Sequence, residues 1–329
     1  MRNSFFIERC GCSRLLVALA LSAVSVIAAA QTAWPSKPVQ LVVSYPPGGL
    51  ADIMARLLQQ PLTEALGRQV IVDNRAGAAG NLAGEAVAKS NDGHTFLVTT
   101  SSIESVNPFM FNKMSFDPKK DLVPIALLAN SRLFLVTRQG LPVASLKEFV
   151  DYARANPGRM AYGSAGIGTT PHLAGEMFKQ NAKFFATHIP YRGAAPALQD
   201  VLAGQIDFAF VPGTAMPSVR AGRIKLLAVA SPVRTAGEPD TPTFVELGFG
   251  EVFADTLFGV YGPAATPPEV VQRLNREINK VLALPATKAR FAEFGADPVP
   301  VSAAEFKAIV QAEALRFGAL VKARNITAE

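Results

Sequence analysis

The chain alternates short strand-like runs with helix-like runs almost from end to end, and this alternation restricts its fold more than any other feature. The runs "VQLVVSY", "QVIVDNR" and "TFLVTTSS" are apolar and rich in β-branched residues, whereas residues 51–66 and 302–322 repeat apolar side chains at helical spacing. Alternation of this kind is typical of α/β proteins. We therefore predict two mostly parallel sheets that are flanked by helices.

The length of the chain and the order of these runs predict two lobes. A chain of 329 residues is long enough for two domains of ordinary size. A second unit starts near residue 130, and the strand-like run "FADTLFGVYGP" from Phe253 leads back to the first unit. We expect residues 31–127 and 255–329 to form lobe 1 and residues 128–254 to form lobe 2, with a ligand cleft between them. Two chain crossings beside a cleft would allow closure by a hinge motion.

Residues 1–30 have the layout of a secretory signal peptide. Arg2, Arg9 and Arg14 give a positively charged start, the run "LLVALALSAVSVI" is an apolar core too short for a comfortable membrane span, and small residues end at Ala30. We expect cleavage near Ala30 and export of the remaining chain. No later stretch is a run of the roughly 18 apolar residues that a membrane span needs.

The cysteines and the charge of the exported chain exclude several kinds of site. Cys10 and Cys12 are the only cysteines and both lie in the signal peptide, so the exported chain has no thiol for a disulfide, a nucleophile or a metal. Loss of the signal peptide removes three arginines and one glutamate, which lowers the formal net charge from +6 to +4. No long basic run appears, so we expect no nucleic-acid partner, whereas the mild positive balance suits a small anion.

Small and polar residues follow the predicted strands at six corners of the chain. The first corner, in "SYPPGGLADIMARLL", has two prolines that hold the chain extended and two glycines that let a ligand approach backbone amides just before a helix. The others are "AGAAGN", "TTSS", "GSAGIGTTPH", "YRGAAPA" and "VPGTAM". Ligands of open parallel sheets bind beyond the carboxyl ends of the strands, so we expect these corners to gather at one cleft.

Classical catalytic and cofactor motifs are missing from these corners. "GSAGIG" follows only a short strand, and no ribose-binding acid lies about 20 residues further on, which argues against a dinucleotide site. The three histidines lie far apart in the sequence and no HExxH pattern occurs, which argues against a metal site. Ser164 lacks the spacing of a nucleophile elbow. We therefore expect neither a cofactor nor a metal.

The sequence allows two roles for each of several polar residues. Asp52, in the first turn of a predicted helix, either caps backbone amides or accepts a hydrogen bond from a ligand amine. His172 either caps a helix or donates to a carboxylate, and Arg192 either clamps an anion or is solvated. We expect His94 to be solvated in a turn and His188 to be a half-buried structural residue.

The order and spacing of several segments resemble the Bug family of periplasmic solute receptors, the substrate-binding components of tripartite tricarboxylate transporters. The matching segments include "WPSKPVQLVVSYPPGGLADIMARLL", "VIVDNRAGAAGN", "YARANPGRMAYGSAGIGTTPHLAGEMF" and "IPYRGAAPALQDVLAGQIDFAF". The resemblance runs from about Trp34 to the C-terminus. It implies a two-lobed periplasmic binding protein fold of type II, whose closing cleft holds a small carboxylate metabolite, and a location in the periplasm.

The resemblance also implies a set of ligand-binding residues, many of which would act through backbone amides. This chain departs from the family at three positions, because it has Tyr45 where Phe is usual, Leu50 where a small polar residue is frequent, and Ala79 where glycine is common. The implied ligand-binding residues are Tyr45, Pro46, Pro47, Gly48, Gly49, Ala51, Asp52, Ala79, Gly80, Asn81, Thr100, Ser101, Ser164, Gly166, Thr169, Thr170, His172, Arg192, Gly193 and Ala194.

The receptor interpretation implies no catalysis, a monomeric chain, and a partnership with the membrane subunits of a transporter. Two alternatives remain open on the sequence alone. One is a receptor that reports ligand occupancy to a signalling partner such as a sensor kinase, and the other is an exported hydrolase that uses Ser164 and His172. The ligand is also open, since a di- or tricarboxylate, an amino acid or an aromatic acid would each supply a carboxylate.

Overall fold

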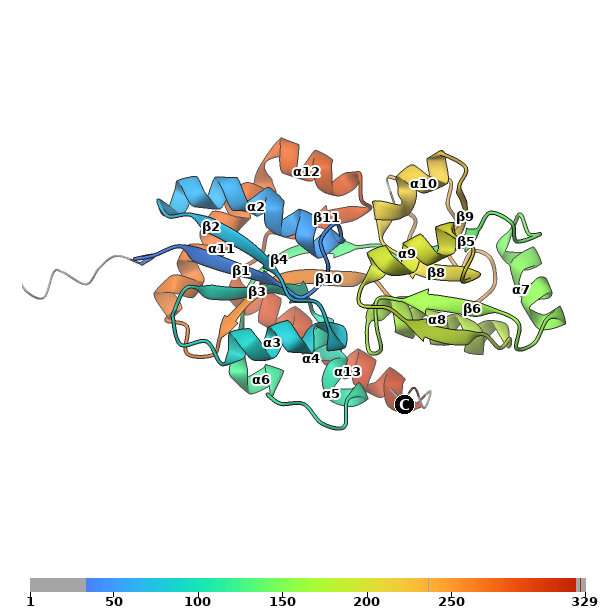
Figure 1. Cartoon of the computed structure of the whole chain (residues 1–329), viewed down its shortest axis with the longest axis horizontal. Coiled ribbons are helices and arrows are strands. Elements are labelled where there is room, and N and C mark those ends of the chain that lie inside the picture. The colour runs from blue at the N-terminus through green and yellow to red at the C-terminus, as the bar shows by residue number, and fades with distance from the viewer. Residues whose placement is uncertain (1–33, 236, 324–325, 327–329) are drawn as a thin grey trace, which may run out of the picture.

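A computed structural model describes residues 34–235, 237–323 and 326 of the chain. The predicted signal peptide, residues 1–30, lies outside these residues. The described chain forms two β-sheets that lie side by side along the long axis of the molecule, each flanked by helices (Figure 1). This arrangement confirms the predicted α/β fold with two sheets.

The first sheet has six strands in the order β11-β4-β10-β3-β1-β2. β1 pairs in parallel with both β2 and β3, whereas β10 is antiparallel to β3 and β4, and β11 is antiparallel to β4. The strands are β1 (Val39–Val43), β2 (Val70–Asn74), β3 (Thr95–Thr100), β4 (Leu122–Ser131), β10 (Thr256–Pro263) and β11 (Ala296–Pro298).

The second sheet has five strands in the order β7-β6-β8-β5-β9. β6 is parallel to β7 and β8, whereas β5 is antiparallel to β8 and β9. The strands are β5 (Phe134–Arg138), β6 (Ala161–Ser164), β7 (Thr187–Pro190), β8 (Phe208–Val211) and β9 (Ile224–Val229).

The prediction of mostly parallel sheets is wrong, because both sheets are mixed. Parallel neighbours need a crossover connection, which is usually a helix. β10 carries the chain back from the second sheet and enters the first sheet between β3 and β4, opposite in direction to both, and β5 lies between β8 and β9 of the second sheet, opposite in direction to both. Only the βα-linked strands β1, β2 and β3 and β6, β7 and β8 are parallel.

The helices cover both faces of each sheet and follow the predicted apolar spacing. In α2, Met54, Leu58 and Leu62 are buried on one face, and Gly67 ends the helix in the left-handed conformation (φ 68°), which glycine adopts without strain. The helices are α2 (Leu50–Leu66), α3 (Asn81–Ala88), α4 (Ser102–Ser105), α5 (Asn107–Met110), α6 (Pro118–Asp121), α7 (Leu146–Ala155), α8 (Thr170–Ala182), α9 (Ala194–Leu202), α10 (Met216–Arg220), α11 (Pro268–Ala283), α12 (Pro285–Ala292) and α13 (Ala303–Ala323), with 3₁₀ turns η1 (Ala78–Gly80) and η2 (Gly213–Ala215).

The C-terminal helix α13 packs against the cores of both sheets. Phe306 and Val310, near its start, belong to a core cluster with strands of the first sheet. Phe317 and Val321, near its end, belong to a cluster with strands of the second sheet. α13 therefore links the two halves of the molecule through apolar contacts. None of the helices within the described residues is long and apolar enough to cross a membrane.

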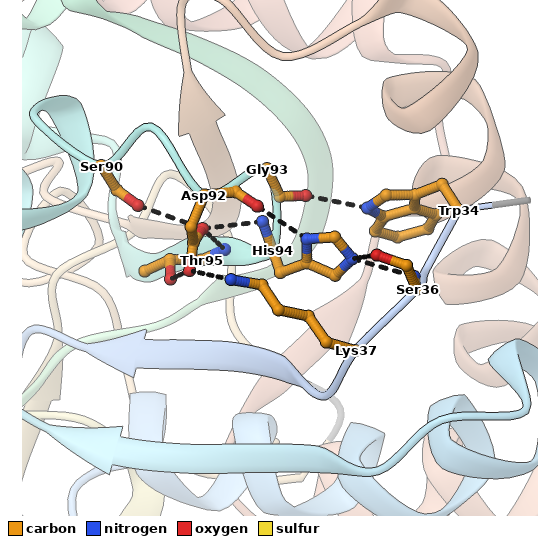
Figure 2. Close-up of polar contacts among 8 residues, drawn as sticks. All are labelled: Trp34, Ser36, Lys37, Ser90, Asp92, Gly93, His94 and Thr95. Carbon is orange, nitrogen blue, oxygen red and sulfur yellow. Dashed lines mark hydrogen bonds and ion pairs between the residues drawn. The ribbon is translucent and has the colours of Figure 1, made fainter. Parts of the chain in front are cut away.

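His94 corrects one expectation from the sequence, since its ring is buried rather than solvated. Figure 2 shows the ring between two backbone groups, with Ser36 N–H donating to Nε2 at 3.0 Å and Nδ1 lying 2.7 Å from the carbonyl oxygen of Asp92. A ring that accepts at Nε2 donates its proton from Nδ1, so these two contacts fix one neutral tautomer. Trp34 Nε1 donates to the Gly93 carbonyl at 2.8 Å, and together these bonds tie the start of the described chain to the turn before β3.

Candidate functional site

The corners that follow strands of both sheets meet around a small cavity of about 40 Å³. The first sheet contributes the corner between β1 and α2, the end of β3 and the start of β10, and the second sheet contributes corners after β6, β7 and β8. The lining residues are Tyr45, Pro46, Gly49, Leu50, Ala51, Thr100, Leu133, Ala165, Thr169, Thr170, Pro171, Ala194, Ala195, Pro212, Thr256 and Phe258. We call this cavity the inner cavity.

Three helices begin at the inner cavity. Ala51 lies in the first turn of α2, Thr170 is the first residue of α8, and Ala194 is the first residue of α9. Amides of a first helical turn have no partner within the helix, and among the described residues these three N–H groups have no hydrogen-bond acceptor. Unpaired amides at the positive ends of helix dipoles favour an anion.

Hydroxyl groups complete the polar lining of the inner cavity. Tyr45 Oη lies 3.0 Å from Thr100 Oγ1, and the hydroxyls of Thr170 and Thr256 are hydrogen-bonded across the cavity, which joins α8 to β10 of the first sheet. Burial raises the pKa of the Tyr45 phenol, so it stays protonated. Within the part of the chain that the structure describes, no Asp, Glu, Lys, Arg or His lines this cavity, so its attraction for an anion comes from peptide and hydroxyl dipoles.

Asp52 holds the corner that precedes α2 and does not line the inner cavity. Its carboxylate accepts hydrogen bonds from Gly48 N–H at 3.0 Å, from Arg56 Nε at 3.0 and 3.1 Å, and from Asn74 Nδ2 at 3.0 Å. Burial alone would raise the pKa of Asp52, but these hydrogen bonds and the Arg56 charge lower it below its usual value. The carboxylate is therefore ionised and already paired within the protein.

A second cavity of about 190 Å³, which we call the outer cavity, adjoins the first. Its wall from the first sheet is the η1 turn, where Gly77, Ala78, Ala79 and Gly80 all have positive φ angles of 148°, 47°, 52° and 90°. The N–H groups of Ala78 and Ala79 have no acceptor among the described residues, and successive amides exposed in this way form an anion-binding concavity. Opposite them, Arg192 is exposed and its guanidinium makes no hydrogen bond or ion pair with the described residues.

Two glycines allow the corners of the two sheets to touch. A Cβ on Gly193 would lie 2.8 Å from Cδ of Pro46, so only glycine lets the start of α9 sit on the first corner. A Cβ on Gly166 would lie 3.2 Å from the Tyr191 carbonyl oxygen and 3.9 Å from Cα of Ala79. The corners of the two sheets therefore approach each other closely beside the cavities.

The structure brings most of the predicted site residues to these two cavities and leaves others beside them. The inner cavity is lined by Tyr45, Pro46, Gly49, Ala51, Thr100, Thr169, Thr170 and Ala194, and the outer cavity by Tyr45, Ala79, Gly80, Gly166 and Arg192. The residues that line neither cavity are Pro47, Gly48, Asp52, Asn81, Ser101, Ser164, His172 and Gly193.

Eight residues that line the inner cavity were not among the predicted site residues, and three of these eight lie where the sequence carries no corner signal. Leu133 lies in the short link between β4 and β5, and Thr256 and Phe258 lie within β10. Ala165 belongs to the marked corner "GSAGIGTTPH". Pro212 belongs to the corner "VPGTAM", which the sequence did mark. The link and β10 reach the cavity only because the chain passes between the sheets there.

Ser164, the buried His172 and the half-buried His188 form a cluster beside the corner that follows β6. Ser164 Oγ lies 2.7 Å from Nε2 of His188, not from His172, and it also contacts the backbone of Gly166. The two imidazoles stack with their centroids 4.2 Å apart, and His172 Nδ1 accepts from Gly168 N–H at 3.3 Å. Burial lowers the pKa of His172 to about 4 and that of His188 to about 3, so both are neutral near pH 7.

Metal coordination finds no support in the described part of the chain, where no three His, Cys, Asp or Glu residues gather around one point.

Several known proteins resemble this chain in both sequence and architecture. The family described as tripartite tricarboxylate transporter family receptor matches residues 54–326. The chain belongs to this family. BugT of Bordetella pertussis is 34% identical over 293 residues, which is 88% of this chain and 90% of that protein. The solved structures similar to this chain include R. palustris Rpa4515 with adipate, which is 33% identical with a TM-score of 0.86 and covers 89% of this chain and 99% of that one.

A further family structure, MatC from Rhodopseudomonas palustris with bound malate, has a TM-score of 0.83 and 29% identity, and covers 88% of this chain and all of that one (100%). The receptor family is therefore one of periplasmic solute-binding proteins, and two of the solved structures similar to this chain hold small carboxylates. The fold of this chain is the fold of those receptors.

Proposed function

We propose that this protein is a periplasmic receptor that captures a small carboxylate between two lobes and delivers it to a membrane transporter. One observation carries the proposal: the unpaired N–H groups of Ala51, Thr170 and Ala194 surround a cavity that no charged side chain lines. A cavity of about 40 Å³ holds roughly three water-sized groups, which is the number of non-hydrogen atoms in a carboxylate. The inner cavity is the proposed carboxylate seat.

The energy of this seat is sufficient for weak binding only. Charge-assisted hydrogen bonds contribute about 1.5–3 kcal/mol each, so three or four of them supply roughly 5–12 kcal/mol. Loss of translational and rotational freedom opposes binding by about 4–15 kcal/mol. Contacts to the rest of the ligand in the outer cavity, together with closure of the lobes, must supply the difference.

The two sheets are the cores of the two proposed lobes. The chain leaves the first sheet at Ser131, enters the second at Phe134, leaves it at Val229 and returns at Thr256. These positions support a lobe 1 of residues 31–127 and 255–329 and a lobe 2 of residues 128–254, with the first crossing moved a few residues later than 127. Closure about the two crossings would enclose the ligand.

Export and a transporter partner follow from the family and from the N-terminal segment, and both belong to the proposal. The sequence of residues 1–30 has the layout of a cleavable signal, and the family is described as the receptor of a tripartite transporter. Deletion of the gene in its host should abolish uptake of the ligand. Loss of a transcriptional response with uptake intact would instead favour the signalling receptor.

The direct test is ligand binding by the exported chain, which begins at Gln31. The chain is unfolded and refolded to remove retained ligand, and its melting temperature is followed with di- and tricarboxylates, amino acids and aromatic acids. A ligand at about 100 times its Kd adds roughly 2.7 kcal/mol to stability, which is easily seen as a rise in Tm. The proposal fails if no carboxylate raises the Tm. It also fails if a carboxylate ester or amide is turned over and Ser164→Ala stops that turnover.

A further inference from the structure

A groove of about 970 Å³ lies between the C-terminal helix α13 and the segment that joins β3 to β4. Figure 1 shows α13 beside α4 and α5 of that segment, and residues of α4, α5, α6 and the start of β4 form the wall opposite α13. The groove shares no lining residue with the inner or the outer cavity. We call it the α13 groove.

The walls of the α13 groove are mainly apolar. Val310, Ala314 and Gly318 line it at four-residue spacing, so they lie on one face of α13. Leu315 on α13 and Phe109 in α5 also line the groove, and they are 77% and 44% exposed. Large apolar side chains that are exposed together around a concave surface are typical of a protein interaction site.

Three lysines stand around this apolar surface. Lys307 lies in the second turn of α13, Lys322 lies in its last turn, and Lys119 lies in α6 on the opposite wall. All three are exposed, and none of their ammonium groups forms a hydrogen bond or ion pair with the described residues. The stretch of helix from Lys307 to Lys322 is about 22 Å long. The positive charge is therefore spread along the groove and not gathered at one point.

Glu104 also lines the α13 groove but offsets little of this charge. Its side chain is buried, and burial raises its pKa to about 7, although Lys119 and Lys307 oppose the rise. A carboxyl group with such a pKa is only partly ionised at neutral pH. The rim of the groove therefore keeps a positive charge.

The shape and the charge of the α13 groove favour an acidic, amphipathic segment of another protein over other occupants. A small anion carries its charge at one place and does not reach three separated lysines, and a flat lipid surface does not fill a groove. A second copy of this chain that docked with two-fold symmetry would bring the same three lysines to the groove. A helix with an apolar face and acidic residues beside that face would fill the groove and pair the lysines.

The packing of α13 connects this groove to the closure of the lobes. Val310 belongs to a core cluster with strands of the first sheet, whereas Val321, which lines the same groove, belongs to a cluster with strands of the second sheet. If the lobes close on a ligand, α13 has to shift against at least one of these cores. We therefore expect the shape of the groove to differ between the open and the closed receptor.

We propose that the α13 groove is the docking site for an acidic, amphipathic segment of a membrane subunit of the transporter. This inference rests on the proposed function, because it takes the protein as a receptor that delivers its ligand to such a transporter. Leu315 and Phe109 bury the apolar face of the partner, and Lys119, Lys307 and Lys322 pair with its acidic residues. Since the groove is separate from both cavities, docking and ligand binding can be changed independently.

Reversal of the rim charges tests docking separately from ligand binding. The triple variant Lys119→Glu, Lys307→Glu, Lys322→Glu and the single variant Leu315→Glu change exposed side chains only. By calorimetry, the exported chain of each should bind its carboxylate within about two-fold of the wild type. In the host lacking the chromosomal gene, and at equal abundance of the protein, each should lower uptake of that carboxylate by about 10-fold or more.

Lys147→Glu is the matched control, because Lys147 on α7 is 80% exposed and lies far along the chain from the groove residues. It should leave both binding and uptake unchanged. A photo-cross-linking residue in place of Gln311, which lines the groove, then identifies the occupant in host cells. We expect an adduct with a membrane subunit of the transporter, at a segment rich in Asp and Glu, and its loss when the three lysines are reversed.

Wild-type uptake by the triple variant would overturn the inference and leave the proposed function standing. The same conclusion follows if Gln311 cross-links only to a second copy of this chain, only to lipid, only to a protein other than a transporter subunit, or to nothing. Failure of the wild-type protein to bind any carboxylate, or uptake that does not depend on its gene, would overturn the proposed function and the inference with it.

Discussion

Arg132 and Asp255 form an ion pair between the two segments in which the chain passes from one sheet to the other. Arg132 lies between β4 and β5, and Asp255 immediately precedes β10. Ser231 Oγ and Asn130 Nδ2 also contact Asp255 Oδ2, at 3.3 and 3.4 Å. The two charged side chains are only 16% and 18% exposed, so the pair lies in a largely desolvated position at the proposed hinge.

We expect Arg132→Gln to destabilise the protein by about 3 kcal/mol, because it leaves the Asp255 carboxylate buried without its charge partner. Burial already raises the pKa of Asp255 and the Arg132 guanidinium opposes this, so the variant should raise that pKa further. Urea unfolding at pH 7 measures the effect. Asp297→Asn is the matched control, because Asp297 contacts the same guanidinium at 3.2 Å but is 65% exposed. It should change stability by less than about 1 kcal/mol; equal effects of the two variants would refute the role of burial.

The His172–His188 pair, buried at His172 and half-buried at His188, should make stability depend on pH. Both pKa values are lowered by burial, to about 4 and about 3, whereas in the unfolded chain histidine titrates near 6.5. Between those values the unfolded state binds more protons than the folded state, so stability falls as the pH decreases from about 6.5 toward 4. Two protons give a maximum slope of about 2.7 kcal/mol per pH unit. His188→Gln should remove about half of the slope between pH 6.5 and 4.5 in urea unfolding, and an unchanged slope would contradict this assignment.

The hydrogen bonds of Asp52 make it a positioning residue, and we expect Asp52→Asn to weaken all carboxylate ligands similarly. The carboxylate holds Gly48 N–H, Arg56 and Asn74, and it lines neither cavity. Removal of its charge loosens the corner at which α2 begins, with an expected loss of about 3- to 30-fold in affinity. Calorimetry measures the affinity of the wild type and of the variant for an amino acid and for its analogue lacking the amine. The loss of affinity is then compared between the two ligands. A loss confined to the amino acid would show that Asp52 contacts the ligand amine.

Much of this architecture could be predicted from the sequence, because the relevant signals are local. Apolar spacing located α2 and α13, and glycine and proline marked the corners that line the cavities. The direction of β5 and β10 was not predictable in this way. It depends on how the chain passes between two sheets, which is a property of the whole topology rather than of any short segment.

The same limit explains the errors around the site. Leu133, Thr256 and Phe258 reach the inner cavity only because the two crossings lie beside it, and no local pattern distinguishes them from ordinary strand residues. Asp52 and Ser164 stand at corners as expected, but their side chains bond to residues beside the same sheet, Gly48 and His188 respectively. The sequence therefore identified where the corners lie. The direction in which each side chain points was known only from the packed structure.

The most direct test of the central claim removes one backbone N–H from the proposed seat and changes little else. Ala194 is the first residue of α9, a position that proline occupies readily because its N–H has no partner in the helix. Ala194→Pro therefore deletes an amide of the inner cavity, and Ala303→Pro makes the same change at the first residue of α13, away from the site.

Calorimetry with the tightest carboxylate ligand, on variants whose unfolding matches the wild type, compares the two substitutions. We predict that Ala194→Pro weakens binding by about 10- to 100-fold, since a charge-assisted hydrogen bond of about 1.5–3 kcal/mol is lost, while Ala303→Pro binds like the wild type. Undiminished affinity in a folded Ala194→Pro protein would contradict capture of the carboxylate by these amides.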